Sequence, residues 1–215
     1  MLKKIIFAMS LMILSAYAGD SFLNSCQKKW EENANAIKSF RSDMVQIFNL
    51  GKASAEQTAK FQFMDSDVFY SKMILNSHLG EMTYICRGDS SYMKIGKSDW
   101  TAQKTSCAEN PMKKKLSDIK KQKFTFLKNL NDKRVYKDDN GKKYTIETQS
   151  CRIIQMNDVV ENTAAQVKIE YEKINGIDIP VKTVIDVPEK NMKSILEYKN
   201  VVVNKGVVKS FFSVK

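Results

Sequence analysis

The segment at residues 167–187, VKIEYEKINGIDIPVKTVIDV, decides the fold class of this 215-residue chain. Its first six residues alternate apolar with charged side chains, a pattern typical of a strand that buries one face. The pair Asn175-Gly176 that follows is a strong signal for a tight hairpin turn. Beyond the turn, every second residue of Ile177–Val187 is apolar or threonine. The segment therefore predicts two long antiparallel strands that share one apolar face.

Similar strand and turn signals recur along most of the chain. Short runs rich in aromatic and β-branched residues are separated by turn residues such as Asp65-Ser66-Asp67. The turn Asp139-Asn140-Gly141 is expected to join the runs 133–137 and 143–148 as a hairpin. Further strands are expected at residues 40–48, 58–64, 68–75, 79–87, 91–96, 193–203 and 207–214. A total of about nine to eleven antiparallel strands predicts a mainly β (α+β) fold whose sheet is long enough to curl strongly.

One helix is expected before the first strand. Phe22, Cys26, Trp30, Ala34 and Ile37 follow one another at spacings of four, four, four and three residues. These spacings place them on a single apolar stripe, with charged residues on the opposite side. The stripe predicts an amphipathic helix that packs against the sheet.

A second helix is expected in the middle of the chain. Asn110-Pro111 is a helix-start signal, and a lysine-rich amphipathic pattern follows over about 111–122. Extension of this helix through residues 124–130 stays open. A basic helix of this kind can lie on an anionic membrane surface or pack its narrow apolar side on the protein, and we favour packing.

Residues 1–18 have the pattern of a secretory signal peptide. Lys3 and Lys4 precede an apolar stretch of about 11 residues, and Ala16-Tyr17-Ala18 supplies small residues for cleavage. The apolar stretch is shorter than the ~20 residues that span a bilayer. A lipid-anchored form at Cys26 is not expected, because polar residues separate that cysteine from the apolar stretch. We therefore expect a single domain at residues 19–215, exported to the periplasm.

The charge of the exported chain points to the cell envelope rather than to nucleic acid. The whole sequence has a formal charge of +11, and loss of Lys3 and Lys4 lowers it to +9. An exported basic protein meets anionic lipid, glycolipid or acidic proteins, although lysines that only solvate the surface explain the charge equally well.

The four cysteines predict cross-links rather than chemistry. Cys26, Cys86, Cys107 and Cys151 are widely spaced and form no CxxC pair, which argues against zinc and redox motifs. An even number of cysteines in an oxidising compartment predicts two disulfides. Three pairings are open, and we favour Cys86–Cys107 with Cys26–Cys151.

No motif indicates an enzyme, a metal site or a cofactor. The chain has a single histidine, His78, in a polar turn, and common nucleophile, phosphate-binding and dinucleotide-binding motifs are absent. The acidic turn at residues 138–141 lacks the ligand spacing of a calcium loop. We expect no catalytic residues, no metal and no cofactor.

The apolar side of the curled sheet is the candidate binding site. Its residues either fill the interior completely or leave an apolar cavity for an acyl chain. Together with Trp30 of the first helix, the candidates are Phe61, Phe63, Phe69, Met73, Met82, Tyr84, Met93, Ile169, Tyr171, Val181, Leu196, Tyr198 and Phe212.

The layout resembles the periplasmic outer-membrane lipoprotein carrier (LolA-like) family of lipoprotein-sorting proteins. The resemblance rests on the order of elements and on four stretches: SFRSDMVQ at 39–46, YEKINGIDIPVK at 171–182, YKNVVVN at 198–204 and Phe211-Phe212. It covers most of the chain after residue 18, with short motifs. Unlike many carriers, this chain has four cysteines, and its segment 65–72 contains neither Pro nor Arg.

The resemblance implies an incomplete β-barrel with the two helices as a lid over a hydrophobic cavity. Such a monomeric carrier takes lipid or acylated lipoprotein from an inner-membrane transporter to an outer-membrane receptor. Lys72, the nearest basic residue to the missing arginine, becomes the hand-off candidate. The alternative function is an envelope interaction module with a filled core, whose lysines at 113–115 and 120–123 bind a partner.

Overall fold

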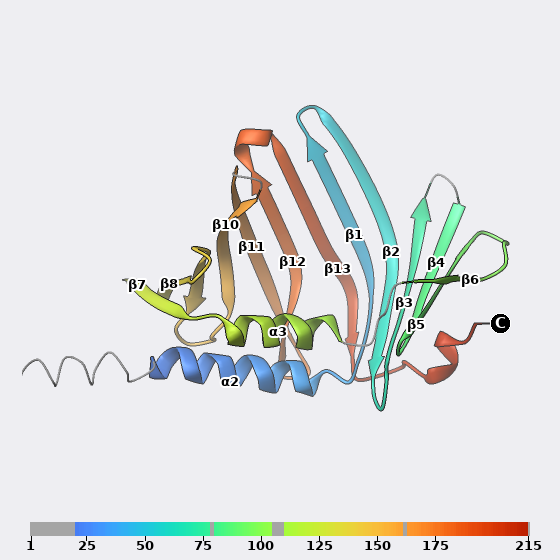
Figure 1. Cartoon of the computed structure of the whole chain (residues 1–215), viewed down its shortest axis with the longest axis horizontal. Helices are drawn as coiled ribbons and strands as arrows, with labels where there is room; N and C mark the ends of the chain where they lie inside the picture. Colours follow the sequence, from blue (N-terminus) through green and yellow to red (C-terminus); the bar gives the residue numbers. More distant parts are fainter. Residues whose placement is uncertain (1–19, 78–79, 105–109, 161–162, 215) are drawn as a thin grey trace, which may run out of the picture.

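The computed structural model describes residues 20–77, 80–104, 110–160 and 163–214. Within these ranges the strands form one sheet of 13 strands, in the order β6-β5-β4-β3-β2-β1-β13-β12-β11-β10-β9-β8-β7. All neighbouring strands are antiparallel. Because β6 and β7 do not pair, the sheet curves without closing (Figure 1). The predicted fold class, a curved antiparallel sheet forming an incomplete barrel with two helices, is confirmed.

Most strands are long and follow one another along the chain as hairpins. Their bounds are β1 Ser39–Leu50, β2 Ala53–Asp65, β3 Phe69–Ser77, β4 Gly80–Arg87, β5 Ser90–Ile95, β6 Thr101–Gln103, β7 Phe124–Leu130, β8 Lys133–Asp138, β9 Lys143–Glu147, β10 Ile153–Val160, β11 Thr163–Ile174, β12 Ile177–Val187 and β13 Met192–Val203. The pairing of β1 with β13 joins the first and last strands in the middle of the sheet.

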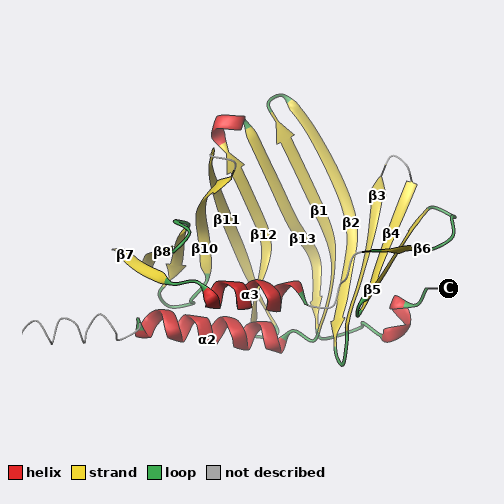
Figure 2. Ribbon diagram, in the orientation of Figure 1, coloured by secondary structure: helices red, strands yellow, loops and turns green. Residues whose placement is uncertain are grey.

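Two α-helices, α2 (Ser21–Ala36) and α3 (Pro111–Lys121), run side by side across one face of the sheet (Figures 1 and 2). Short 3₁₀ turns η1 (Pro188–Lys190) and η2 (Lys209–Phe212) follow β12 and β13. We call the face covered by the helices the inner face and the opposite one the outer face. In the described part of the chain, no helix is long and apolar enough to cross a membrane.

Strand register shows which residues share the inner face, because directly opposed residues on neighbouring strands point to the same side. One row crosses nine strands from β7 to β2: Phe126, Tyr136, Tyr144, Met156, Val167, Ile185, Ser194, Phe48 and Ala55. Its members Tyr136, Tyr144 and Met156 pack against Leu23 and Cys26 of α2. The row therefore belongs to the inner face.

The core is divided into three clusters. Two lie under the helices, one around Cys26 and Tyr136 and one around Ile37, Phe40 and Phe63. The third lies on the outer face, where Phe212 of η2 packs against Tyr70 and Ile85. The chain therefore buries apolar side chains on both faces of the sheet at its β3–β4 end.

Both helices agree with the sequence prediction to within one residue at each end, and β12 has the predicted bounds. Residues 124–130, in contrast, do not extend α3. The helix ends at Lys121, and these residues form β7, which pairs with β8 across a two-residue turn at Asn131-Asp132. Asn131 has a left-handed backbone (φ 51°), which such a turn favours.

The strand predicted at residues 207–214 is wrong. Residues 209–212 form the η2 turn, and its Phe212 is only 1% exposed. Packing on the outer face therefore explains the apolar residues there. The sheet also contains β6 and β10, which the sequence patterns did not identify. In β10, a register shift between Ile153 and Gln155 breaks the alternation that would have indicated a strand.

Candidate functional site

A pocket of about 230 Å³ lies between the two helices and the inner face of the sheet. The helix side is formed by Trp30, Ala34 and Ile37 of α2 and by Ile119 of α3. Residues Ile153, Met156, Ile169, Tyr171, Pro180 and Thr183 form the sheet side. Most of these side chains are apolar, so the pocket suits an apolar ligand group.

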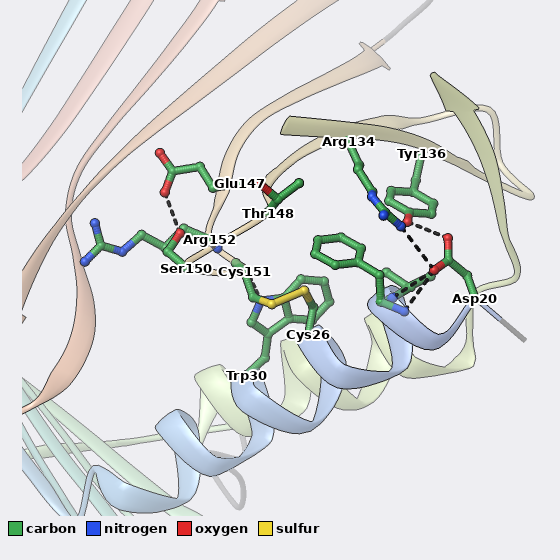
Figure 3. The surroundings of a disulfide bond; sticks show 12 residues. Asp20, Cys26, Trp30, Arg134, Tyr136, Glu147, Thr148, Ser150, Cys151 and Arg152 are labelled. Carbon is green, nitrogen blue, oxygen red and sulfur yellow. Dashed lines mark hydrogen bonds and ion pairs between the residues drawn. A yellow bond between two sulfur atoms is a disulfide. The ribbon is translucent and has the colours of Figure 1, made fainter. Parts of the chain in front are cut away.

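The α2 wall of this pocket is covalently attached to the sheet. Cys26 of α2 and Cys151 of the β9–β10 loop form a disulfide (Figure 3). One turn further along α2, the Trp30 Nε1–H donates a hydrogen bond to the carbonyl oxygen of Cys151. Cys26 is completely buried. Two consecutive turns of α2 are therefore held against one loop.

The beginning of α2 is attached a second time through Asp20. Its Oδ1 accepts hydrogen bonds from the backbone N–H groups of Phe22 (3.0 Å) and Leu23 (3.3 Å), as an N-cap does. Its other oxygen accepts one from the Tyr136 hydroxyl, and Arg134 Nη1 lies 3.7 Å from Oδ1 (Figure 3). Burial, together with this carboxylate, raises the pKa of Tyr136 to about 12. The phenol therefore stays a hydrogen-bond donor at neutral pH.

One side of the pocket is polar. Arg152 Nη2 donates to Asp178 Oδ1 at 2.6 Å, and the guanidinium carbon lies 5.6 Å from the centre of the Tyr171 ring. The hydrogen bond that the Arg152 guanidinium donates to the Asp178 carboxylate is the main cause that raises the pKa of Arg152. Within the described residues, the buried Arg152 Nε has no hydrogen-bond partner. The pocket thus combines apolar walls with an ion pair that has one unused donor.

Helix α3 contains no cysteine, so its attachment, unlike that of α2, is not covalent. Lys113 Nζ lies 2.8 Å from Asp65 Oδ2 at the end of β2, and the Asn110 amide donates to the same oxygen at 3.0 Å. Burial opposes ionisation of Asp65, but these hydrogen bonds and the charge of Lys113 together lower its pKa. At the other end, the Asn140 amide donates to Gln122 Oε1 just after the helix. These contacts are non-covalent and partly exposed.

The structure brings three of the predicted cavity residues, Trp30, Ile169 and Tyr171, to this pocket. Four others, Phe61, Met73, Tyr84 and Met93, form one row across β2, β3, β4 and β5. Register places this row on the inner face, beside the row Tyr198, Met44, Ala59, Leu75, Met82 and Ile95. The side chains of Phe61, Met73, Met82, Tyr84, Met93, Leu196 and Tyr198 are all half-buried.

Three further candidates lie deeper. Phe63, Phe69 and Val181 are buried in the cluster around Ile37 and Phe40. They form packed core next to the pocket rather than its surface. Val181 is the extra residue of a β-bulge, because Glu170 pairs with Lys182 and Tyr171 with Pro180.

The structure places Phe212 and Lys72 away from the other candidates. Phe212 packs on the outer face, with its ring 5.5 Å from that of Tyr70. Lys72 pairs in register with Gln62, and both are the immediate sequence neighbours of the inner-face residues Met73 and Phe61. Because successive residues of a strand point to opposite faces, Lys72 also lies on the outer face. Neither residue reaches the pocket under the helices.

The Cys26–Cys151 disulfide is confirmed. Cys86 is also disulfide-bonded, while Cys107 lies outside the described residues, as do His78 and the predicted signal peptide at 1–18. Among the described residues, no group of three or more His, Cys, Asp or Glu side chains could hold a metal ion.

The polar side of the pocket, Arg152 and Asp178, was not among the residues predicted from the sequence. Arg152 follows Cys151 directly, so its position near the first helix followed from the favoured disulfide pairing. Asp178 lies at a position that strict alternation assigns to the opposite face of its strand. Pro180 is the signal that could have indicated the bulge that changes this, because a proline inside a strand cannot donate a ladder hydrogen bond.

The fold and the pocket together define a class of protein: a strongly curved antiparallel sheet, open at its edges, with helices that cover an apolar space on the inner face. No protein-family model matches the sequence. No curated protein matches it either.

Several solved structures share this fold. A DUF1329 family protein from Desulfovibrio piger matches with a TM-score of 0.64 at 11% identity, over 88% of this chain and 96% of that one. A putative outer membrane lipoprotein-sorting protein domain from Vibrio parahaemolyticus matches at 0.59 and 8% identity, over 87% and 95%. A LolA superfamily protein from Nitrosomonas europaea matches at 0.57 and 11% identity, over 88% and 96%. The resemblance to the LolA-like family is thus confirmed at the level of the fold.

Proposed function

We propose that this chain is a non-catalytic periplasmic carrier that binds acyl chains of lipids or acylated lipoproteins between its helices and its sheet. The observation that carries the proposal is the apolar pocket of about 230 Å³ between α2, α3 and the inner face. The shared fold with a putative lipoprotein-sorting domain supports it.

The inner face beyond this pocket supports the same function. The row Phe61, Met73, Tyr84 and Met93 is apolar across four neighbouring strands, yet none of its side chains is fully buried. In a sheet with a filled core these side chains would be covered. Methionine and aromatic side chains adapt to flexible apolar ligands.

The pocket must enlarge before it holds a complete acyl chain. Sites for drug-sized ligands measure roughly 300–1,000 Å³, and this pocket is smaller. The α2 wall is fixed by the disulfide, whereas α3 is held by the ion pair of Lys113 with Asp65. Binding therefore involves displacement of α3 and of Ile119, which lines the pocket. In this function an inner-membrane transporter loads the carrier, an outer-membrane receptor unloads it, and the carrier works as a monomer.

Native mass spectrometry of the protein purified without detergent tests the proposal. We expect a bound lipid or acylated peptide that adds a discrete mass to the chain. Protein that carries no such mass, and that also fails to bind a fluorescent fatty-acyl probe, would refute carriage and favour the interaction module with a filled core.

The pocket itself is tested by the change Ile169→Asp, with Lys168→Asp as its matched control. Ile169 lines the pocket, and Lys168 is the residue directly before it on the same strand, with its side chain on the outer face. A carboxylate at position 169 must lose its hydration when an acyl chain binds. We expect probe affinity to fall about tenfold or more, or ~1.4 kcal/mol, while the control keeps its affinity. Equal losses in the two variants would contradict binding at this pocket.

A further inference from the structure

A second depression, of about 390 Å³, lies on the outer face where β1, β2 and β3 run side by side. Its lining includes the cations Arg41, Lys60 and Lys72 and one carboxylate, Asp43. Strand register places the depression on the outer face. Arg41, Gln62 and Lys72 form one row across the three strands. This row is displaced by one residue from the inner-face row that contains Phe61 and Met73. The sheet therefore separates this depression from the acyl-chain pocket.

In the part of the chain that the structure describes, the three cations of the depression have no ion-pair partner. Among the described residues, no carboxylate oxygen lies within 4.0 Å of the charged nitrogens of Arg41, Lys60 or Lys72. Asp43 is opposite Lys60 in register, but its Oδ2 accepts a hydrogen bond from the Asn200 amide at 2.7 Å. Lys199, opposite Asp43 on β13, pairs with Glu197 instead.

Neighbouring like charges on one face of a sheet repel each other. Lys60 and Lys72 are diagonal neighbours on β2 and β3, which places their Cβ atoms roughly 7–8 Å apart. Arg41 and Lys72 are two strands apart, about 10 Å. An anion between the three side chains would relieve the repulsion and bind the folded state in preference to the unfolded chain.

We propose that this depression binds a phosphate group, either a free phosphate or the headgroup of a lipid. The three cations and Asp43 leave a formal charge of +2 in the lining, and a phosphate monoester carries about −1.5 to −2 at neutral pH. The guanidinium of Arg41 can bind two phosphate oxygens at once, and each lysine adds a point charge. This site is independent of the proposed acyl-chain pocket, because it lies on the opposite face.

The test compares the unmodified protein with the double variant Lys60→Gln, Lys72→Gln. A second double variant, Lys128→Gln with Lys168→Gln, is the control. It removes the same charge from two exposed lysines that have no ion pair among the described residues and lie outside the depression. Two probes are used at constant ionic strength: inorganic phosphate, followed by thermal unfolding, and phosphatidylcholine vesicles with and without phosphatidic acid, followed by co-sedimentation.

We expect phosphate or phosphatidic acid to bind the unmodified protein and the control equally, and to bind the Lys60, Lys72 variant at least about tenfold more weakly. Stabilisation by inorganic phosphate alone assigns a soluble phosphate ligand. Binding to phosphatidic acid vesicles, with or without an effect of phosphate, assigns a lipid headgroup. Equal loss of binding in the two double variants, or no binding of either probe, would overturn the proposal.

Discussion

Removing the Cys26–Cys151 disulfide is expected to lower the free energy of unfolding by about 2–5 kcal/mol. The two cysteines are 125 residues apart in sequence, so the bond closes a long loop in the unfolded chain. The chain-entropy relation gives about 5 kcal/mol for a loop of that length at 25 °C, and residual structure in the unfolded chain lowers the value. Few other single features of the chain should contribute as much.

The double variant Cys26→Ala, Cys151→Ala tests this magnitude better than a reducing agent does, because Cys86 is disulfide-bonded too and would also be reduced. Urea unfolding followed by circular dichroism gives the free energy. The single variant Cys26→Ala also breaks the bond, so it should match the double variant apart from differences in local packing. A loss below about 1 kcal/mol in both variants would refute the reasoning that the cross-link acts by restricting the unfolded chain.

Three further changes test contacts that hold the helices. Asn204→Ala should lower the free energy of unfolding by about 2 kcal/mol. The Asn204 side chain accepts hydrogen bonds from two backbone N–H groups and donates one to a backbone carbonyl, all in the segment where α2 ends and β1 begins. An unchanged urea midpoint would contradict this. Tyr136→Phe removes the hydroxyl that donates to Asp20 and should cost about 1 kcal/mol, again measured by urea unfolding, and a stabilised variant would argue against this anchor of α2. The pKa of Asp65 is lowered from 3.8 in the folded protein, so its ion pair with Lys113 stabilises α3 above pH 3.8 and is lost as the pH falls through the lowered pKa. Amide hydrogen exchange of α3 is measured relative to that of the β1 amides at each pH. In the unmodified protein it should accelerate as the pH falls below the lowered pKa, whereas in Asp65→Asn it should show no such change. Equal pH profiles in the two proteins would exclude this ion pair as the cause of the acceleration.

Alternation along the sequence predicted the strands of this sheet but could not predict its bulges. In β12 the predicted bounds, Ile177–Val187, agree with the structure. The register shift at Tyr171 and Pro180 nevertheless moves side chains from one face to the other partway along the strand. The pocket is consequently lined by Asp178 and Pro180 and, beyond the bulge, by Thr183. A strictly alternating strand would not place these three residues on one face.

A local sequence pattern predicted α2 correctly but predicted the wrong structure for residues 207–214. The helix stripe from Phe22 to Ile37 identified α2 because five residues at helical spacing leave little choice of structure. Residues 207–214 contain enough apolar side chains for a strand, yet they form the η2 turn and cover Tyr70 on the outer face. Local pattern does not tell a strand from a segment that packs on one, because both bury apolar residues next to a sheet.

The unequal attachment of the two helices decides which of them can open the pocket. α2 is held by a disulfide, by the Trp30 hydrogen bond to the same loop and by the Asp20 contacts at its start. Displacing it from Cys151 would require breaking a covalent bond, which thermal motion does not do. α3 contributes one wall residue, Ile119, which packs against the core cluster around Cys26. An ion pair to Asp65 and hydrogen bonds at its two ends also hold this helix. Partly exposed ion pairs contribute about 1 kcal/mol or less, and a buried isoleucine side chain contributes about 1.5–3 kcal/mol. An acyl chain that buries several methylene groups, each worth about 0.8 kcal/mol, can offset the loss of these two contacts. If the chain carries acyl chains as we propose, entry from the α3 side, against a fixed α2 wall, is therefore the route that we expect.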